Sequence, residues 1–200
     1  APGEIPPGEF TNAGAGVAWL VPGGSRATAK LMAAALRHGL YLQSSEEAFV
    51  HDQRSFPSGT LIFPSARNDG DIASVLEQLA RETGADVVGV DGSWITSGPD
   101  FGSNKTPRIV APRVAIAWDA PTDVYSPGAV RFVLERQFGY PVVPIRTRTL
   151  KTADLNRFDV VILPDESRWG SGGYADVLGS AGKDNLADWV SDGGVLVTLA

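Results

Sequence analysis

The stretch that decides the fold runs through RVAIAW (Arg113–Trp118), PGAVRFVLERQF (Pro127–Phe138), VVPI (Val142–Ile145) and DVVILP (Asp159–Pro164). Short apolar runs rich in Val and Ile alternate here with a helical pattern. This alternation is typical of parallel strands that are buried on both faces of a sheet. We therefore predict an α/β unit with a doubly wound parallel sheet over residues 113–200.

The carboxyl ends of these strands form the edge where a ligand is expected, because ligands of doubly wound sheets bind beyond that edge. One loop there begins at Asp119 and another at Asp165. The loops supply carboxylates, hydroxyls, a guanidinium and an aromatic ring beside flexible glycines, which is a mixture suited to binding. The candidate ligand-binding residues are Asp119, Asp165, Glu166, Ser167, Arg168, Trp169 and Ser171.

Two interpretations are open for Asp165 and Glu166. They could act as an acid and a base, or hold a cation with water. Alternatively, they cap backbone amides around a glycine-rich loop, and we favour this second interpretation. We place that loop at residues 166–182 and the next helix at Lys183–Ser191.

Patterns for catalysis and metal binding are missing from the sequence. The chain has no Cys and only two His, and neither His38 nor His51 begins a zinc-binding motif. A Ser-His-Asp triad within the second half is impossible, because no His follows His51. We therefore predict no catalytic residue, no metal ligand and no cofactor in this chain, and we assign His51 to a solvated loop.

The first half of the chain predicts a smaller α/β unit. Residues 1–15 are rich in Pro and Gly and predict an extended linker, whereas residues 16–92 have the order β-α-β-β-α-β. This order fits a ferredoxin-like split unit or a second doubly wound sheet, since order alone does not fix strand direction. Residues 93–112 have little apolar pattern, so we predict a linker there, with Trp94 buried between the two halves.

Two helices of this smaller unit have recognisable ends. Ser25 is placed to cap the first helix, and Gly39 suits a left-handed residue after its last turn. The second helix is predicted to start at Asp69 or Asp71, to bury one apolar face and to end at Gly84.

Composition bounds the class of protein. A formal net charge of −6, without long runs of one sign, argues against nucleic acid as the main partner. No apolar stretch approaches the roughly 20 residues that a membrane span requires. The chain ends directly after the apolar run Val195–Leu199, where an α/β unit normally continues into a loop and a helix. We therefore expect the second unit to be truncated at its C-terminus.

Residues 113–200 resemble the class I glutamine amidotransferase-like fold through RVAIAW, DVVILPD and GGVLVTLA, which helices separate. The resemblance implies a flavodoxin-like parallel sheet. Active members of that family carry a Cys nucleophile at a strand-to-helix elbow and a later His. This chain has no Cys, so glutaminase activity is not expected.

A longer pattern covers nearly the whole chain. It joins the Pro-rich lead-in, GVAWLVP (Gly16–Pro22), FPSGTLIFP (Phe56–Pro64) and DGSWITSGPDFGS (Asp91–Ser103) to the amidotransferase-like block. This pattern resembles the region that follows the catalytic domain in bacterial zinc carboxypeptidases of the carboxypeptidase A-like family. The resemblance implies a secreted or periplasmic metallopeptidase as the parent protein, with the zinc and its ligands in a preceding peptidase domain.

These patterns lead to three hypotheses for function. The first is a non-catalytic accessory region that packs on the preceding peptidase domain or binds a peptide or cell-wall glycan. The second is an amidotransferase-like hydrolase that uses Asp165, Glu166 and Ser167 with residues from beyond Ala200. The third is a small-molecule-binding module that holds its ligand over Asp119 and residues 166–173.

Overall fold

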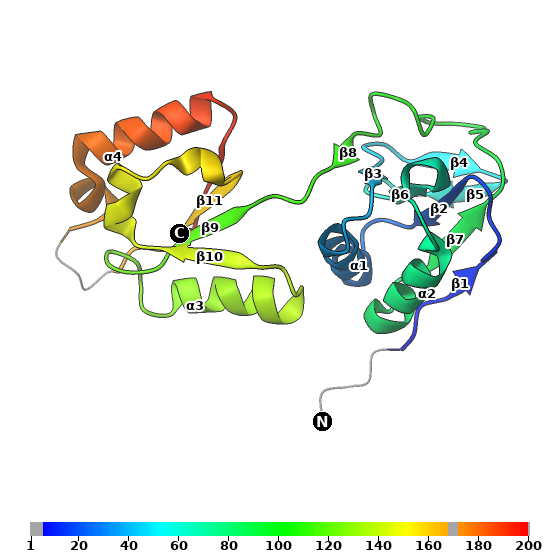
Figure 1. Cartoon of the computed structure of the whole chain (residues 1–200), viewed down its shortest axis with the longest axis horizontal. Helices are drawn as coiled ribbons and strands as arrows, with labels where there is room; N and C mark the ends of the chain where they lie inside the picture. Colours follow the sequence, from blue (N-terminus) through cyan, green and yellow to red (C-terminus); the bar gives the residue numbers. More distant parts are fainter. Residues whose placement is uncertain (1–5, 168–171, 200) are drawn as a thin grey trace. The chain divides into compact units, whose positions relative to one another are not determined.

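The computed structural model of the chain describes residues 6–167 and 172–199 (Figure 1). The chain divides into two compact units, unit 1 (Ala1–Ala111) and unit 2 (Pro112–Ala200). Each unit combines a sheet with helices, which confirms the α/β class. Among the described residues, no helix is long and apolar enough to cross a membrane.

The elements of unit 1, in chain order, are β1 (Phe10–Thr11), β2 (Ala18–Val21), α1 (Arg26–Arg37), β3 (Leu42–Ser44), β4 (Phe49–His51), β5 (Arg54–Phe56), β6 (Leu61–Pro64), η1 (Ser65–Arg67), α2 (Ile72–Thr83), β7 (Val87–Val90) and β8 (Arg108–Ile109).

The central strands of unit 1 form a split β-α-β arrangement. The sheet has the order β1-β7-β2-β6-β3-β8. Strand β2 runs antiparallel to both β6 and β7, and β3 runs antiparallel to β6. Helix α1 therefore joins the parallel strands β2 and β3 across β6, and α2 joins β6 to β7 across β2. These directions are those of the ferredoxin-like alternative, and they exclude a doubly wound parallel sheet for this unit.

The predicted helix ends in unit 1 are confirmed. Ser25 caps α1 and Asp71 caps α2, and each side chain accepts a hydrogen bond from the backbone N–H three residues ahead. Gly39 and Gly84 follow the two helices with φ angles of +72° and +77°. A glycine adopts this left-handed conformation without the steric cost of a Cβ atom.

Both faces of the unit 1 sheet are covered. One face packs against α1 and α2 through side chains that include Trp19, Val21 and Phe63. The other face packs against the hairpin of β4 and β5, where the rings of Phe49 and Phe56 stack with their centroids 5.1 Å apart. Successive side chains of β2 and β6 pack on opposite faces of the sheet, because side chains alternate between the two faces along a strand.

Two segments predicted to be linkers belong to unit 1. Strand β1 pairs with β7 and extends the sheet, and Gly8 N donates to Ala80 O in α2 at 3.1 Å. Strand β8 pairs with β3, and Gln43 Nε2 donates to the carbonyls of Phe101 (3.0 Å) and Thr106 (2.8 Å). Backbone pairing holds these segments, which is why they show little apolar pattern. The boundary between the units lies after Ala111, at the C-terminal end of the predicted linker 93–112.

The sequence-based placements of His51 and Trp94 are wrong. His51 is 2% exposed, its Nε2 lies 2.8 Å from Gly92 O, and its ring stacks on Phe101. Its burial comes from the loop after β7, a contact that the polar neighbours of His51 in the sequence do not predict. Trp94, expected to be buried, is 80% exposed.

The elements of unit 2, in chain order, are β9 (Val114–Ala117), α3 (Ser126–Arg131), the π-helical segment η2 (Phe132–Gln137), β10 (Val142–Ile145), η3 (Thr147–Lys151), η4 (Leu155–Arg157), β11 (Val160–Leu163), α4 (Tyr174–Ser191) and β12 (Val195–Thr198).

Unit 2 is a parallel sheet between two helical layers (Figure 1). Its strands have the order β10-β9-β11-β12, and every pair is parallel. Helix α3 and η2 cover one face, where Val130 and Leu134 pack on Ile116. Helix α4 and the short helices after β10 cover the other face, where Leu186 and Trp189 are buried. The prediction of a parallel sheet is thus confirmed. Burial on both faces holds for the central strands β9 and β11 and not for β12, whose residues are all exposed.

Helix α4 is longer than predicted, because it begins at Tyr174 instead of Lys183. Gly179 interrupts it with a φ angle of +60°, so two helical segments meet at a kink. Gly and Ser are weak helix formers, which is why this part of the sequence predicts a loop. The loop after β11 is therefore shorter than the predicted range of 166–182.

Candidate functional site

The candidate site lies at the carboxyl ends of β9 and β11, where two loops are joined by backbone hydrogen bonds. Asp123 N donates to Asp165 O at 2.7 Å, and Ser167 N donates to Pro121 O at 2.8 Å. Thr122 and Glu166 form an isolated antiparallel bridge between these two bonds. A doubly wound sheet would leave a crevice between two such loops. In unit 2 the backbones of the loops are paired with each other there.

Asp119 holds the loop after β9 to the segment after β10. Its Oδ1 accepts a hydrogen bond from Thr147 N at 2.7 Å, and Thr147 Oγ1 donates to Asp119 O at 3.2 Å. Thr147 is fully buried at the start of η3. Asp119, a candidate ligand-binding residue, therefore fixes the position of a backbone segment.

Asp123 and Ser126 fix the start of α3 in a similar way. Asp123 Oδ1 accepts from Tyr125 N at 2.8 Å and from Ser126 N at 3.2 Å, and Ser126 Oγ accepts from Asp165 N at 3.1 Å. Sequence reasoning did not single out either side chain. The sequence does contain a signal for them: Asp123 lies three residues before Ser126-Pro127, where α3 begins, and this pattern is typical of helix capping.

Glu166 supports the first turn of α4. Its Oε1 accepts from Tyr174 N at 2.6 Å. A Cβ atom on Gly173 would lie 2.6–2.9 Å from the Glu166 carboxyl group, so a side chain there would displace this carboxylate. The carboxylate is thus bonded to one of the backbone N–H groups that a helix start leaves unpaired, and its charge is favoured by the helix dipole.

The side chain of Tyr174 joins the start of α4 to the end of β11. Its Oη donates to Pro164 O at 2.9 Å. Burial raises the pKa of Tyr174, and the charges of Glu166 and Asp165 raise it further. The phenol therefore stays protonated at neutral pH and remains a hydrogen-bond donor to the end of β11.

The structure brings four of the seven predicted site residues to one edge of the sheet: Asp119, Asp165, Glu166 and Ser167. Arg168, Trp169 and Ser171 lie outside the described residues. Asp119 and Glu166 each accept a backbone hydrogen bond, and Asp165 and Ser167 contribute backbone atoms to the bonds between the loops. Both histidines of the chain belong to unit 1, so unit 2 contains no imidazole base.

A pocket of about 270 Å³ opens beside these loops. Its walls include Trp118, Asp119, Thr122, Asp123 and Val124. Among the described residues, the walls offer carboxylate oxygens and apolar surface but no cationic side chain. A ligand that donates hydrogen bonds, such as a hydroxylated sugar or a peptide amide, suits this surface better than an anion.

Exposed apolar side chains surround the pocket. Val124 and Tyr125 are each 80% exposed, and Trp118 is 43% exposed. The Arg131 guanidinium lies 4.9 Å from the Trp118 ring centre, a cation–π contact that fixes the position of the indole. Aromatic side chains at the end of a parallel strand were the sequence signal for this surface, and the candidate set above omitted them.

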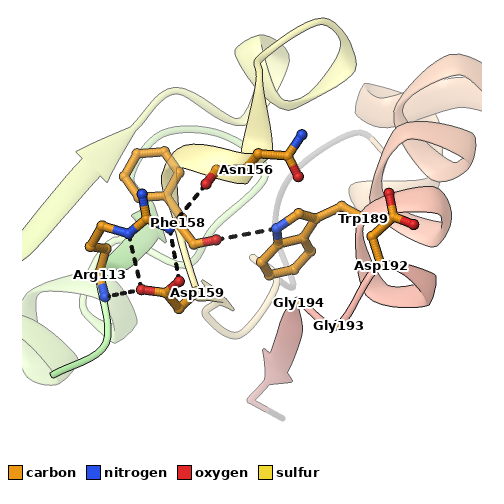
Figure 2. Close-up of a pocket in the computed structure, with 8 residues that line it drawn as sticks. All are labelled: Arg113, Asn156, Phe158, Asp159, Trp189, Asp192, Gly193 and Gly194. Atoms are coloured by element: carbon orange, nitrogen blue, oxygen red, sulfur yellow. Dashed lines mark hydrogen bonds and ion pairs between the residues drawn. The ribbon is translucent and has the colours of Figure 1, made fainter. Parts of the chain in front are cut away.

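A second cavity, of about 190 Å³, lies at the amino ends of the strands (Figure 2). Arg113 makes a forked contact there with Asp159, with Nε–Oδ2 at 3.0 Å and Nη2–Oδ1 at 2.8 Å. These bonds hold the pKa of Asp159 at about 2. Trp189 Nε1 donates to Phe158 O at 3.3 Å. These polar groups bond to one another across the bases of the strands, so this cavity is structural.

Unit 2 is thus an α/β unit. The loops after β9 and β11 are joined by backbone hydrogen bonds, and exposed aromatic side chains lie beside them. Within residues 6–167 and 172–199, no group of three or more His, Asp or Glu side chains could hold a metal ion. Comparison of the chain with protein-family models, with curated proteins and with solved structures found no match.

Proposed function

We propose that this chain is a non-catalytic accessory region of a secreted or periplasmic zinc carboxypeptidase-like protein, and that unit 2 binds a peptide or a cell-wall glycan. One observation carries the proposal: the carboxylates of Asp119, Asp123 and Glu166 at the carboxyl edge accept hydrogen bonds from backbone amides of their own unit. An acid, base or nucleophile needs a free group directed at substrate. The hydrolase alternative requires that role of Glu166, whose Oε1 is bonded to the start of α4.

The surface that would bind the ligand is formed by Trp118, Val124 and Tyr125 with the pocket beside them. Aromatic side chains with low rotamer entropy are frequent anchors of binding surfaces. A volume of about 270 Å³ is at the lower limit for ligand pockets and fits one side chain or one sugar ring. This size favours recognition of one unit of a polymer over a bound cofactor.

The fold assignment in this proposal is the flavodoxin-like one. The order β10-β9-β11-β12 agrees with the order 2-1-3-4 with which that fold begins. Zinc would be held by a peptidase domain outside this chain, since the described residues do not fit a zinc site. Every step of catalysis would then belong to that domain.

Binding can be tested by titrating the chain with an unstructured peptide and with soluble peptidoglycan fragments, followed by heteronuclear NMR. We expect shifts at residues 118–125. Replacement of Tyr125 by Ala should weaken binding by about tenfold or more, as for a central aromatic anchor. Trp94→Ala is the matched control, because Trp94 is equally exposed but lies in unit 1. Absence of binding to both ligands, or equal effects of the two variants, would refute the binding role.

The accessory role can be tested separately in the protein that contains this chain. Removal of residues 1–200 should leave zinc-dependent cleavage of a short peptide unchanged and should reduce cleavage of a polymeric or cell-wall substrate. Loss of cleavage of the short peptide after Glu166→Gln, in a variant that folds, would favour the hydrolase alternative instead.

A further inference from the structure

Two carboxylates in the walls of the pocket after β9 each keep one oxygen free. Asp119 uses Oδ1 to accept from Thr147 N. Asp123 uses Oδ1 to accept from Tyr125 N and Ser126 N. Within the described residues, neither Oδ2 accepts a hydrogen bond and neither carboxylate has an ion-pair partner. The loop thus fixes both carboxylates through one oxygen and leaves the other oxygen to a ligand.

The cation beside this pocket is balanced by another residue. The Arg131 guanidinium lies 4.9 Å from the Trp118 ring centre, and its Nη2 lies 2.9 Å from Glu135 Oε1. Glu135 therefore offsets the charge of Arg131, and the two aspartates of the pocket keep their negative charge without a counter-charge in the described part of the chain. Two negative charges in one pocket favour a ligand with a positive charge.

A buried hydroxyl group in the same wall also lacks a partner. Thr122 is only 8% exposed, and its Oγ1 makes no hydrogen bond to any described residue. In that part of the chain, Trp19 Nε1 is the one fully enclosed polar side-chain atom without a partner, so Thr122 Oγ1 keeps contact with solvent. Thr122 lines the pocket, and its hydroxyl therefore opens into it. Burial of a polar group is costly unless a hydrogen bond offsets it, so this hydroxyl points to a ligand.

The rest of the pocket is apolar and belongs to one loop. Trp118, Ala120, Val124 and Pro127 complete its walls. Strand β11 separates β9, which leads into this loop, from the last strand, β12. The volume of about 270 Å³ accommodates one long side chain, and an aliphatic stem suits walls of this kind.

We infer that this pocket binds the ammonium group of a lysine-like side chain in a peptide. The inference rests on the binding role proposed for unit 2 and names the group that is recognised. An ammonium group has three donors and no acceptor, and Asp119, Thr122 and Asp123 offer three acceptors. Its methylene groups would pack on Trp118. A sugar hydroxyl could donate to the same oxygens, but it has no charge to offset theirs.

A metal ion fits these residues less well than an ammonium group. Calcium takes six to eight oxygen ligands. Among the described residues, no group of three or more His, Asp or Glu side chains could hold a metal ion.

NMR titration of the 200-residue chain with three ligands tests the inference. The ligands are the capped tripeptide acetyl-Ala-Lys-Ala-amide, the same peptide with norleucine in place of lysine, and the uncharged glycan chitotetraose. Norleucine keeps the aliphatic stem and lacks the ammonium group. We expect shifts at residues 118–127, with the lysine peptide bound at least about fivefold more tightly than the norleucine peptide. Its binding should weaken when the salt concentration rises from about 50 mM to about 500 mM.

Three variants test the acceptors. Asp119→Asn and Asp123→Asn keep an amide oxygen for the backbone N–H groups and lose the charge, so each should weaken binding of the lysine peptide by about fivefold. Thr122→Val removes the hydroxyl at nearly constant volume and should weaken it by about threefold. Asp184→Asn is the matched control, because it removes the same charge from an exposed position in α4. The amide spectrum verifies that each variant is folded.

The outcomes separate this inference from the binding role on which it rests. Equal affinity for the two peptides, or shifts with chitotetraose alone, overturns the ammonium site and leaves the binding role standing. Effects of Asp119→Asn and Asp123→Asn no larger than that of Asp184→Asn also overturn the site. Absence of shifts with all three ligands at about 10 mM overturns the site and the binding role together. The comparison of lysine with norleucine requires no variant, so it decides even if a substitution disturbs the loop.

Discussion

Replacement of Glu166 by Ala is the most direct test of whether the candidate site is structural. The variant loses the acceptor for Tyr174 N at the start of α4 and a negative charge near the positive end of the helix dipole. Loss of a helix cap costs about 1 kcal/mol, and loss of the charge about 0.5 kcal/mol at an exposed position. The free energy of unfolding of unit 2 should therefore fall by about 1.5 kcal/mol. For a unit of this size, the midpoint of thermal unfolding should fall by roughly 6–12 °C.

The Glu166→Gln variant separates a structural role from a chemical one. Its amide oxygen still accepts from Tyr174 N, so it should lose only the charge, about 0.5 kcal/mol. Calorimetry and urea unfolding measure both variants. Asp184→Ala is the control, because Asp184 is an exposed carboxylate in the middle of α4. The capping role is refuted if Glu166→Ala unfolds within about 0.3 kcal/mol of the control.

The remaining predictions concern the amino ends of the unit 2 strands. Gly194→Ala should destabilise unit 2 by about 1–3 kcal/mol in urea unfolding, because the new Cβ atom would lie 2.1–2.5 Å from the Trp189 ring. In a Trp189→Leu background, Gly194→Ala should lower the free energy of unfolding by less. An unchanged effect would contradict a clash with the Trp189 ring as the cause. Arg113 holds the pKa of Asp159 at about 2, below its ordinary 3.8. The stabilisation is thus complete above pH 3.8 and lost as the pH falls through 2. Asp159→Asn should remove this part of the acid dependence of urea unfolding between about pH 5 and about pH 2, and an unchanged profile would exclude the pair as its source.

The layers of the fold were predictable because burial leaves a period in the sequence. Runs of Val and Ile located β9 to β12, and the apolar face of α2 located that helix. The start of α4 was not predictable, since Gly172, Gly173 and Gly179 break the helical pattern while Glu166, distant in sequence, supports the first turn. The hairpin of β4 and β5 was missed for a related reason. Its rings are buried by contacts with the sheet and with the loop after β7, and the polar residues around them give no sign of this.

The candidate site was predictable in position but only partly in role. Four of its residues lie at the carboxyl edge, as the order of strands and helices indicated. Whether Asp119 or Glu166 acts on a ligand or on backbone amides depends on which N–H groups the loops bring within reach. That depends on loop conformation, which no local pattern encodes. The same limit explains why Trp118 and Tyr125 were not among the candidates.

The pairing between the loops after β9 and β11 has a consequence for how this surface can change. The bonds join backbone atoms of Pro121, Asp123, Asp165 and Ser167, so they do not depend on the side chains displayed nearby. Substitutions at the exposed positions 124 and 125 leave this framework intact. The side chains at these positions can therefore be changed without redesign of the fold, and the same loops are a suitable place to graft a new binding sequence.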